Sequence, residues 1–352
     1  MTKNMTLMEQ EARQSPQIIT EQLQKNHKIL SGLSERIKKT NPEFAVTIAR
    51  GSSDHASTFA KYLIESKLGL VTSSAAPSVL TLYKSKLNFK KAIAIGVSQS
   101  GESPDICEVM SQARKGGAIT LSFVNHPESH LAKESEYVIP LHAGEEKAVA
   151  ATKSYITTLS AMLHAVGLCA GDKELIENLK KLPASLEKSL SMDWSPCVDI
   201  FKDIKDTLVI ARGYCYPIAQ EAALKFKETC SIHAEAFSGA EVLHGPFALM
   251  KKNYPVLLFA EDDSSLKGII DLARKMKNVG VKTLLAAPKN EIPKDTLDEI
   301  ASVALPLPES VHKLCDPLMI IQAFYPMMAH LAVKRGCNPD APDNLKKITE
   351  TF

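Results

Sequence analysis

The sequence lacks several features that would place it in a specialised class. Its 352 residues include a single tryptophan and carry a formal net charge of only +2, with no run of lysine or arginine. A nucleic-acid partner is therefore not indicated. The longest apolar stretches, residues 155–171 and 318–333, fall short of the ~20 residues that a membrane-spanning helix needs. We expect buried helices there and no membrane partner.

Paired cysteines and glycine-rich nucleotide motifs are also missing. None of the seven cysteines lies in a Cys-x-x-Cys pair, which predicts reduced thiols in a reducing compartment. Residues 1–13 are polar and acid-containing, unlike a signal peptide, so we expect a cytoplasmic protein. Neither a Gly-x-x-x-x-Gly-Lys nor a Gly-x-Gly-x-x-Gly motif occurs, so nucleotide binding is disfavoured and no cofactor is expected.

One pattern of apolar segments occurs twice. Residues 44–51 read FAVTIARG and residues 207–213 read TLVIARG. Three further apolar segments follow in each copy, at 92–97, 118–124 and 137–141, and at 255–260, 281–287 and 303–307. Arg50 and Arg212 differ by 162 positions, and Ala118 and Val281 by 163. Recurrence at nearly one offset indicates an internal duplication.

Short apolar strands that alternate with helical stretches predict an α/β fold of two tandem domains. Each domain is expected to be an open parallel sheet with helices on both faces. We expect a helical segment at 1–40, a first domain at 41–195, a second at 196–335 and a mobile tail at 336–352. Residues 155–191 read as two helices within the first domain. Ligands should bind at the carboxyl ends of the strands, where strand order reverses.

A polar loop follows the apolar segment 92–97 directly. It contains four candidate phosphate ligands, Ser98, Gln99, Ser100 and Ser103. Amide groups at a helix start favour an anion, and hydroxyl groups add neutral donors. The alternative is a helix cap formed by Ser100 or Ser103.

The loop after the first strand has the same character and favours the phosphate interpretation. Gly51, Ser52 and Ser53 would lie beside residues 98–103. In the second copy, the loop that corresponds to residues 98–103 is acidic, with Glu261, Asp262 and Asp263. An acidic loop would repel phosphate, so we expect the two copies to differ in role.

The helix of the second copy carries a possible proton-transfer set. Glu221, Lys225 and Glu228 are spaced by 4 and 3 positions, which places them on one helical face. Alanines around them favour a buried helix, although a solvated stripe of charges is the alternative. Buried carboxylate–lysine sets have shifted pKa values and suit acid–base catalysis.

A histidine on a turn completes the candidate set. His244 precedes Gly245-Pro246, so it should lie on a turn. A histidine that titrates near neutral pH suits the opening of a sugar ring, and a structural role is the alternative. His233, Glu235 and His244 do not form a recognised ligand set, so no metal site is expected.

These motifs resemble the SIS (sugar isomerase) domain family, in particular the isomerase half of glucosamine-6-phosphate synthase. Residues 98–103 are similar to its SQSGE[ST] loop, and 221–228 (EAALKFKE) to its EGALKLKE helix. Residues 233–246 resemble its HAEAYAAGELKHGP segment, and 342–349 its PRNLAKSVT tail. The resemblance extends from about residue 40 to the C-terminus.

The resemblance implies a role for each matching residue. Glu228 would move a proton between C1 and C2, supported by Lys225 and Glu221, and Lys347 would approach C2 from a tail that closes over the sugar. His244 would open the ring and come from the neighbouring subunit of a homodimer. The implied phosphate and sugar ligands are Gly51, Ser52, Ser53, Ser98, Gln99, Ser100, Ser103, Val149 and Ala151.

The departures from the synthase pattern shape the expected reaction. The synthase adds a glutaminase domain with a nucleophilic N-terminal cysteine, whereas the first cysteine here is Cys107. Ala151 replaces a serine of the family, and Asp343 replaces an arginine. We therefore expect an aldose–ketose isomerase type of deaminase that converts glucosamine 6-phosphate to fructose 6-phosphate and ammonia. Alternatives are a deglycase of fructosyl-amino-acid phosphates, a galactosamine-6-phosphate deaminase/isomerase, and a sugar-phosphate-sensing module without catalysis.

Overall fold

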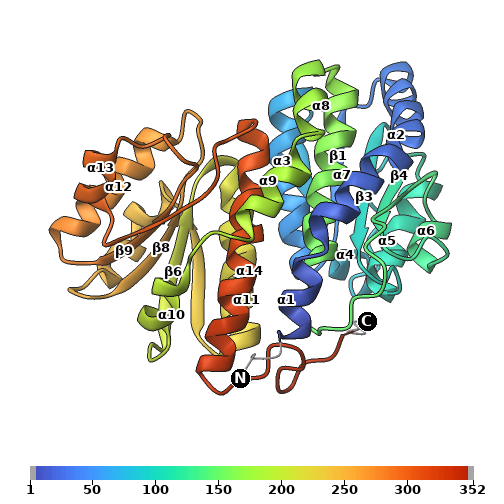
Figure 1. Cartoon of the computed structure of the whole chain (residues 1–352). Helices are drawn as coiled ribbons and strands as arrows, with labels where there is room; N and C mark the ends of the chain where they lie inside the picture. Colours follow the sequence, from blue (N-terminus) through green and yellow to red (C-terminus); the bar gives the residue numbers. More distant parts are fainter. Residues whose placement is uncertain (1–4, 348–352) are drawn as a thin grey trace. The chain divides into compact units, whose positions relative to one another are not determined.

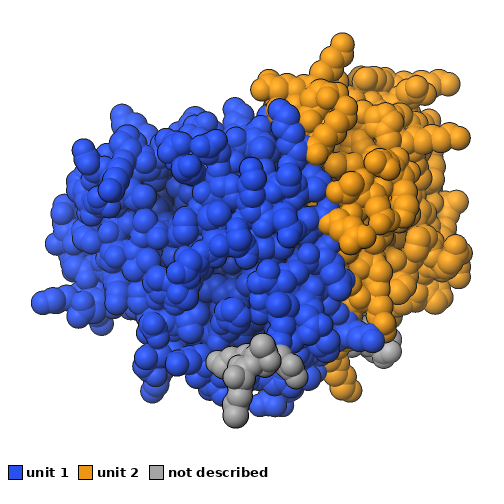
Figure 2. Space-filling view, in the orientation of Figure 1, with its two compact units in different colours: residues 1–16, 147–152, 181–345 blue, residues 17–146, 153–180, 346–352 orange. Residues whose placement is uncertain are grey.

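The computed structural model describes residues 5–347, in two compact units (Figures 1 and 2). One consists of residues 17–146, 153–180 and 346–352, and the other of residues 1–16, 147–152 and 181–345. They are called here the first-copy unit and the second-copy unit, because each contains one copy of the repeat. The last five residues of the expected tail, 348–352, lie outside the described residues.

The first-copy unit contains a parallel five-stranded sheet in the order β2-β1-β3-β4-β5. Its strands are β1 (Phe44–Ile48), β2 (Thr72–Ser74), β3 (Ala92–Ser98), β4 (Ile119–Val124) and β5 (Tyr137–Pro140). Its helices are α2 (Ser15–Thr40), α3 (Ser52–Leu68), α4 (Pro77–Thr81), α5 (Pro104–Lys115), α6 (His130–Lys133), α7 (Lys153–Ala170) and α8 (Lys173–Leu179). Strands β3 and β4 are buried along their whole length, which explains their largely apolar sequence.

The second-copy unit contains a parallel five-stranded sheet in the order β10-β9-β8-β6-β7. Its strands are β6 (Asp206–Ala211), β7 (His233–Ser238), β8 (Pro255–Phe259), β9 (Lys282–Ala286) and β10 (Val303–Leu305). Its α-helices are α1 (Leu7–Ala12), α9 (Leu182–Ser189), α10 (Ser195–Phe201), α11 (Tyr216–Cys230), α12 (Leu266–Asn278), α13 (Lys294–Ile300) and α14 (Asp316–Lys334). Its 3₁₀ turns are η1 (Gly213–Cys215), η2 (Glu241–His244), η3 (Pro246–Leu249) and η4 (Lys313–Cys315).

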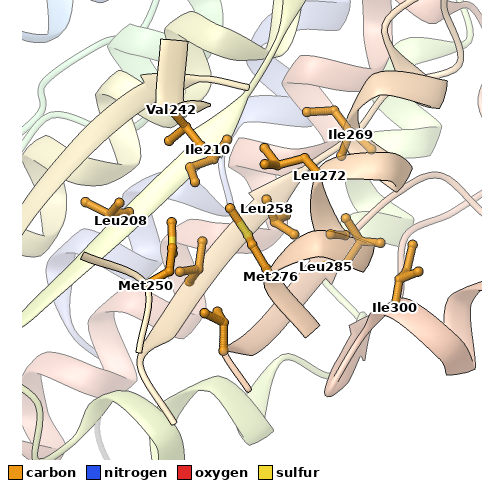
Figure 3. Packing of buried hydrophobic residues seen from close by; sticks show 14 of the residues in the cluster. Leu208, Ile210, Val242, Met250, Leu258, Ile269, Leu272, Met276, Leu285 and Ile300 are labelled. Atoms are coloured by element: carbon orange, nitrogen blue, oxygen red, sulfur yellow. The ribbon is translucent and has the colours of Figure 1, made fainter. Parts of the chain in front are cut away.

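Helices cover both faces of the second-copy sheet. Leu272 and Met276 of α12 pack on one face, against Ile210 and Leu258 of the strands (Figure 3). On the other face, the ring of Phe259 contacts that of Phe324 in α14, with centroids 6.4 Å apart. In the first-copy unit, α5 packs on one face of the sheet and α3 and α7 pack together. The predicted α/β architecture is therefore confirmed.

The strand register shows that the two sheets are copies of one plan. In the first copy, Val46 of β1 pairs with Ala94 of β3. In the second copy, Leu208 of β6 pairs with Val256 of β8, and both partners lie 162 positions further along the chain. The predicted duplication is thus present in the pairing of individual residues.

Each sheet has one strand that the sequence analysis did not predict. Strand β2 has only three residues, two of them exposed, so it gives no apolar run. Strand β7 lies at a sheet edge and alternates between exposed and buried positions at its start, with His233 and Glu235 outside and Ala234 inside. Its period of two is the signal that was missed, since residues 233–246 were interpreted as one motif.

Two smaller features complete the fold. The segment predicted as two helices contains three, because α9 begins at Leu182 with a proline in its first turn, where proline favours a new helix start. Within residues 5–347, no helix combines the length and the apolar character required to cross a membrane.

Candidate functional site

The expected phosphate loop connects the end of β3 to the start of α5. The Ser98 hydroxyl accepts a hydrogen bond from the Gly101 amide (2.9 Å), and the Ser100 hydroxyl accepts one from the Glu102 amide (3.3 Å). Ser103 precedes α5, but its side chain makes no capping hydrogen bond. Helix capping by the Ser103 side chain is therefore not observed. Gln99, Ser100 and Ser103 are partly exposed at the carboxyl end of the sheet.

Gly101 is required by the packing of this loop. Its φ is +70°, and a Cβ atom there would lie 2.1 Å from the hydroxyl oxygen of Ser129, which follows β4. The Gly101 carbonyl also accepts a hydrogen bond from the Leu131 amide (3.0 Å). The segment after β4 therefore holds the loop in shape, and the close approach of Ser129 is a structural reason for the glycine.

The second expected phosphate segment begins α3. Gly51 is the N-cap residue, with φ +57°, and Ser52 and Ser53 form the first helical turn. Strands β1 and β3 are parallel neighbours, so this turn and residues 98–103 lie at the same edge of one sheet. A Cβ atom built on Gly51 would meet no heavy atom within 4 Å. Two polar segments at the end of adjacent strands are suited to hold an anion.

Arg50 is a candidate that the sequence analysis missed. Its Nε and Nη2 atoms donate to Oδ2 of the buried Asp105 at 2.9 and 2.7 Å, which fixes the guanidinium beside the start of α5. The side chain remains 51% exposed. Both copies end their first strand in Arg-Gly, so the sequence alone did not distinguish Arg50 from Arg212. The distinguishing signal is Asp105, because the residue 162 positions later is Lys267.

The proton-transfer candidates form a buried ion-pair set on α11. The Nζ atom of Lys225 lies 3.0 Å from Oε1 of Glu221 and 2.7 Å from Oε2 of Glu228. The hydroxyl of Tyr325 in α14 donates to Oε1 of Glu221 (3.2 Å). The side chains of Lys225 and Glu221 are 1% and 0% exposed, so the set is not a solvated stripe.

The environment of Lys225 favours a permanent positive charge. Burial by itself would lower the pKa of the ammonium group, but Glu221 and Glu228 outweigh burial and raise this pKa. The side chain of Glu228 is 22% exposed, whereas that of Glu221 is enclosed. Glu228 is therefore the carboxylate of the pair that a substrate can approach, and Lys225 holds it by an ion pair of 2.7 Å.

His244 ends the short turn η2 and is exposed, as expected for a histidine before Gly-Pro. The following residue, Gly245, has φ +149°. His233 and Glu235 lie on β7. Within residues 5–347, no group of three or more His, Cys, Asp or Glu side chains is placed to hold a metal ion.

Val149 and Ala151 lie in the segment 147–152 of the second-copy unit. The Val149 amide donates to the Asp340 carbonyl (2.9 Å), and the Ala148 amide donates to Oε2 of Glu11 (3.2 Å). Both Val149 and Ala151 are partly exposed. Two segments distant in sequence thus hold this short connection in place.

Lys347 is held by a buried carboxylate of the first-copy unit. Its Nζ atom lies 3.0 Å from Oε2 of Glu146, whose side chain is fully enclosed. The same Oε2 accepts a hydrogen bond from the Ser154 hydroxyl (2.7 Å) at the start of α7. Glu146 was not a candidate in the sequence analysis, because two adjacent glutamates in a loop form no recognisable pattern.

The structure gathers the candidates into two sets. The first-copy unit holds Gly51, Ser52, Ser53, Ser98, Gln99, Ser100, Ser103 and Lys347. The second-copy unit holds Val149, Ala151, Glu221, Lys225, Glu228 and His244.

Comparison with known proteins places this geometry in a family. The chain is 32% identical over 347 residues to glutamine–fructose-6-phosphate aminotransferase (isomerizing) of Methanothermobacter thermautotrophicus, covering 97% of this chain and 56% of that protein. The chain thus spans about half the length of the curated relatives it matches.

Two solved structures are similar over nearly the whole chain. One, from Silicibacter pomeroyi and provisionally named a phosphosugar isomerase, is 34% identical with a TM-score of 0.87, covering 96% of this chain and 100% of that one. The C-terminal domain of glucosamine-fructose-6-phosphate aminotransferase from Francisella tularensis is 27% identical with a TM-score of 0.83, covering 96% and 98%. The SIS domain model matches residues 41–166 and 200–331. The chain therefore belongs to the SIS domain family and is related to the isomerase portion of these aminotransferases.

Proposed function

We propose that the chain deaminates glucosamine 6-phosphate, yielding fructose 6-phosphate and ammonia. The observation that carries this proposal is the set on α11, in which buried Lys225 holds the partly exposed carboxylate of Glu228 at 2.7 Å. A carboxylate that is positioned by a permanent cation and open on one side suits the transfer of a proton between adjacent carbons.

The reaction divides among the candidate residues as follows. Residues 98–103 and the turn at Ser52 and Ser53 hold the phosphate, and His244 assists the opening of the sugar ring. Glu228 removes the proton from C2 and returns it to C1, which turns the amino aldehyde into a ketose imine. Water then adds to C2 of the imine, and ammonia leaves.

Lys347 and the dimer belong to the same proposal. The ammonium group of Lys347, which is paired with Glu146, would move to the substrate at C2 when the tail closes. His244 would come from the second subunit of a homodimer, a role that agrees with its exposed position on η2. The cytoplasm is the expected location, since the scattered cysteines are all free.

The test is the release of ammonia and fructose 6-phosphate from glucosamine 6-phosphate by the purified protein, without added cofactor. Glu228→Gln should lower kcat about 10²- to 10⁴-fold and change KM little, because the phosphate contacts remain. The matched control is Glu235→Gln, which makes the same change at an exposed position of β7 and should keep full activity.

Two outcomes would contradict the proposal. Full activity of Glu228→Gln would remove Glu228 from the reaction. Product formation from a fructosyl-amino-acid 6-phosphate or from galactosamine 6-phosphate, but not from glucosamine 6-phosphate, would mean that the same proton chemistry acts on a different substrate.

A further inference from the structure

The acidic loop of the second copy occupies the place of the phosphate loop in the first. Strands β3 and β8 have the same register against their neighbours, at an offset of 162 positions. Residues 260–263 therefore correspond to residues 98–101, and Glu261 stands in the place of Gln99. Both loops begin at the carboxyl end of a strand next to the first strand of their copy.

The side chain of Glu261 reaches across to the neighbouring strand end. Its Oε1 atom accepts hydrogen bonds from the amides of Tyr214 (2.8 Å) and Cys215 (3.3 Å). At an offset of 162, these amides correspond to those of Ser52 and Ser53, where the phosphate is expected. The carboxyl group thus takes, in the second copy, the position that an anion would take in the first.

The two glycines at these turns show the same difference. Gly51 and Gly213 have nearly equal φ values, +57° and +62°. A Cβ atom on Gly213 would lie 2.7 Å from Oε1 of Glu261, whereas one on Gly51 would meet no heavy atom within 4 Å. The space beside the turn is filled by a side chain in one copy and open in the other.

Burial keeps the side chain of Glu261 in the space beside the turn at Gly213. The residue is fully buried, and its Oε2 atom has no hydrogen-bond partner within residues 5–347. Burial, and then the charges of Asp263 and Asp316, raise its pKa well above the usual range, against the opposing effect of the two amides. A carboxyl oxygen can accept both hydrogen bonds in either protonation state of the side chain.

The turn that Glu261 holds leads directly into the candidate catalytic helix. η1 ends at Cys215 and α11 begins at Tyr216, so the two bound amides precede the helix that carries Glu221, Lys225 and Glu228. We propose that the Glu261 carboxyl group occupies, in the second copy, the position that an anion would take in the first. We propose also that Glu261 is a positioning residue for the set Glu221, Lys225 and Glu228. Its effect on catalysis rests on the proposed function, whereas its hold on the turn does not.

Hydrogen exchange tests the hold on the turn without any substrate. In Glu261→Ala the acceptor is lost, so a peptide covering residues 213–216 should exchange at least about tenfold faster. Glu261→Gln keeps an oxygen acceptor and should retain the protection. The matched control is Leu258→Ala in β8, a buried apolar change that destabilises the same unit without removing a contact of the turn. It should raise exchange across the unit rather than at this peptide alone.

Kinetics then test the positioning role. At a temperature where all variants are folded, Glu261→Ala should lower kcat about tenfold or more, with KM changed less than about threefold, since a displaced catalytic group costs rate rather than binding. Glu261→Gln should restore kcat, and Leu258→Ala should keep it.

The hydrogen-exchange experiment and the kinetic experiment test the role of Glu261 and the proposed function separately. Unchanged exchange at residues 213–216 in Glu261→Ala, or a Gln variant as impaired as the Ala variant, would overturn the inference. Absence of activity in the unmodified protein would count against the proposed function alone, because the exchange experiment would still decide the role of Glu261.

Discussion

We expect Asp316 to make the stability of the second-copy unit dependent on pH. Burial raises the pKa of its carboxyl group to about 7, although a hydrogen bond from the Ser310 hydroxyl opposes the shift. The folded state therefore binds this proton more tightly than the unfolded state does. Its contribution to stability is complete below pH ~4 and is lost as the pH rises to about 7.

Asp316→Asn should remove this dependence. We expect the free energy of unfolding of the unmodified protein to fall by up to about 1.4 kcal/mol per pH unit between pH 4 and 7 from this group. The Asn variant, which cannot ionise, should lose that slope and be more stable at pH 7. Urea denaturation at several pH values measures both. Asp271→Asn, on the exposed face of α12, is the control that should keep the slope; an equal slope in Asp316→Asn would contradict the assignment.

Single residues differ in how far the sequence predicted them. The shared face of Glu221, Lys225 and Glu228 follows from helical spacing, and their burial from the alanines around them. The ion pair of Glu146 with Lys347 and the hydrogen bond from the Tyr214 amide to Glu261 were not predicted, because each joins segments distant in the chain.

At the scale of elements, the turns at Gly51 and Gly213 form a natural comparison. Both glycines have a positive φ, which side chains rarely adopt, so alanine at either position costs about 1–3 kcal/mol in backbone strain. Only Gly213 also faces a neighbouring carboxyl oxygen at 2.7 Å. Gly213→Ala should therefore destabilise the protein by about 1–3 kcal/mol more than Gly51→Ala.

The thermal midpoints of the two glycine variants check this expectation. Circular dichroism should show the larger loss for Gly213→Ala, and Glu261→Ala in the same chain should recover part of the difference, since the clash is removed. Equal losses for both glycines would mean that Glu261 does not fill the space beside the second turn.

Elements were predicted well where burial decides the pattern. Strands β3 and β8 are largely apolar because they are buried along their whole length. Strands β2 and β7 were missed because β2 has only three residues, two of them exposed, and β7 begins with alternating exposed and buried residues instead of an apolar run. The helices of residues 155–191 were also predicted incompletely. Pro183 lies in the first turn of a new helix, so one expected helix is divided into α8 and α9.

At the scale of the whole molecule, the proposed dimer predicts complementation between inactive variants. If His244 acts in the partner's site, a dimer of one His244→Ala chain and one Glu228→Gln chain contains one complete site of two. Random mixing of the variants should restore about a quarter of the original activity, because half of the dimers are mixed. Ammonia release after co-refolding measures this.

The control pairs two variants on the same helix. Glu228→Gln and Lys225→Met should not complement, because Glu228 and Lys225 lie on one helix of one chain and pair with each other. Inactive mixtures of His244→Ala and Glu228→Gln, in a sample that is dimeric by sedimentation, would place His244 in its own subunit's site or outside the reaction.

The amino-acid sequence alone determined the α/β class, the duplication and the spacing of the Glu–Lys–Glu set, because these depend on periodicity and on distances along one helix. Only the tertiary structure decided what fills the end of each sheet. Residues 98–103 and Glu261 stand at corresponding positions, but the sequence showed only that one loop is polar and the other acidic. That the acid bonds to the amides of Tyr214 and Cys215 depends on the pairing of β6 with β8, which joins segments nearly 50 residues apart.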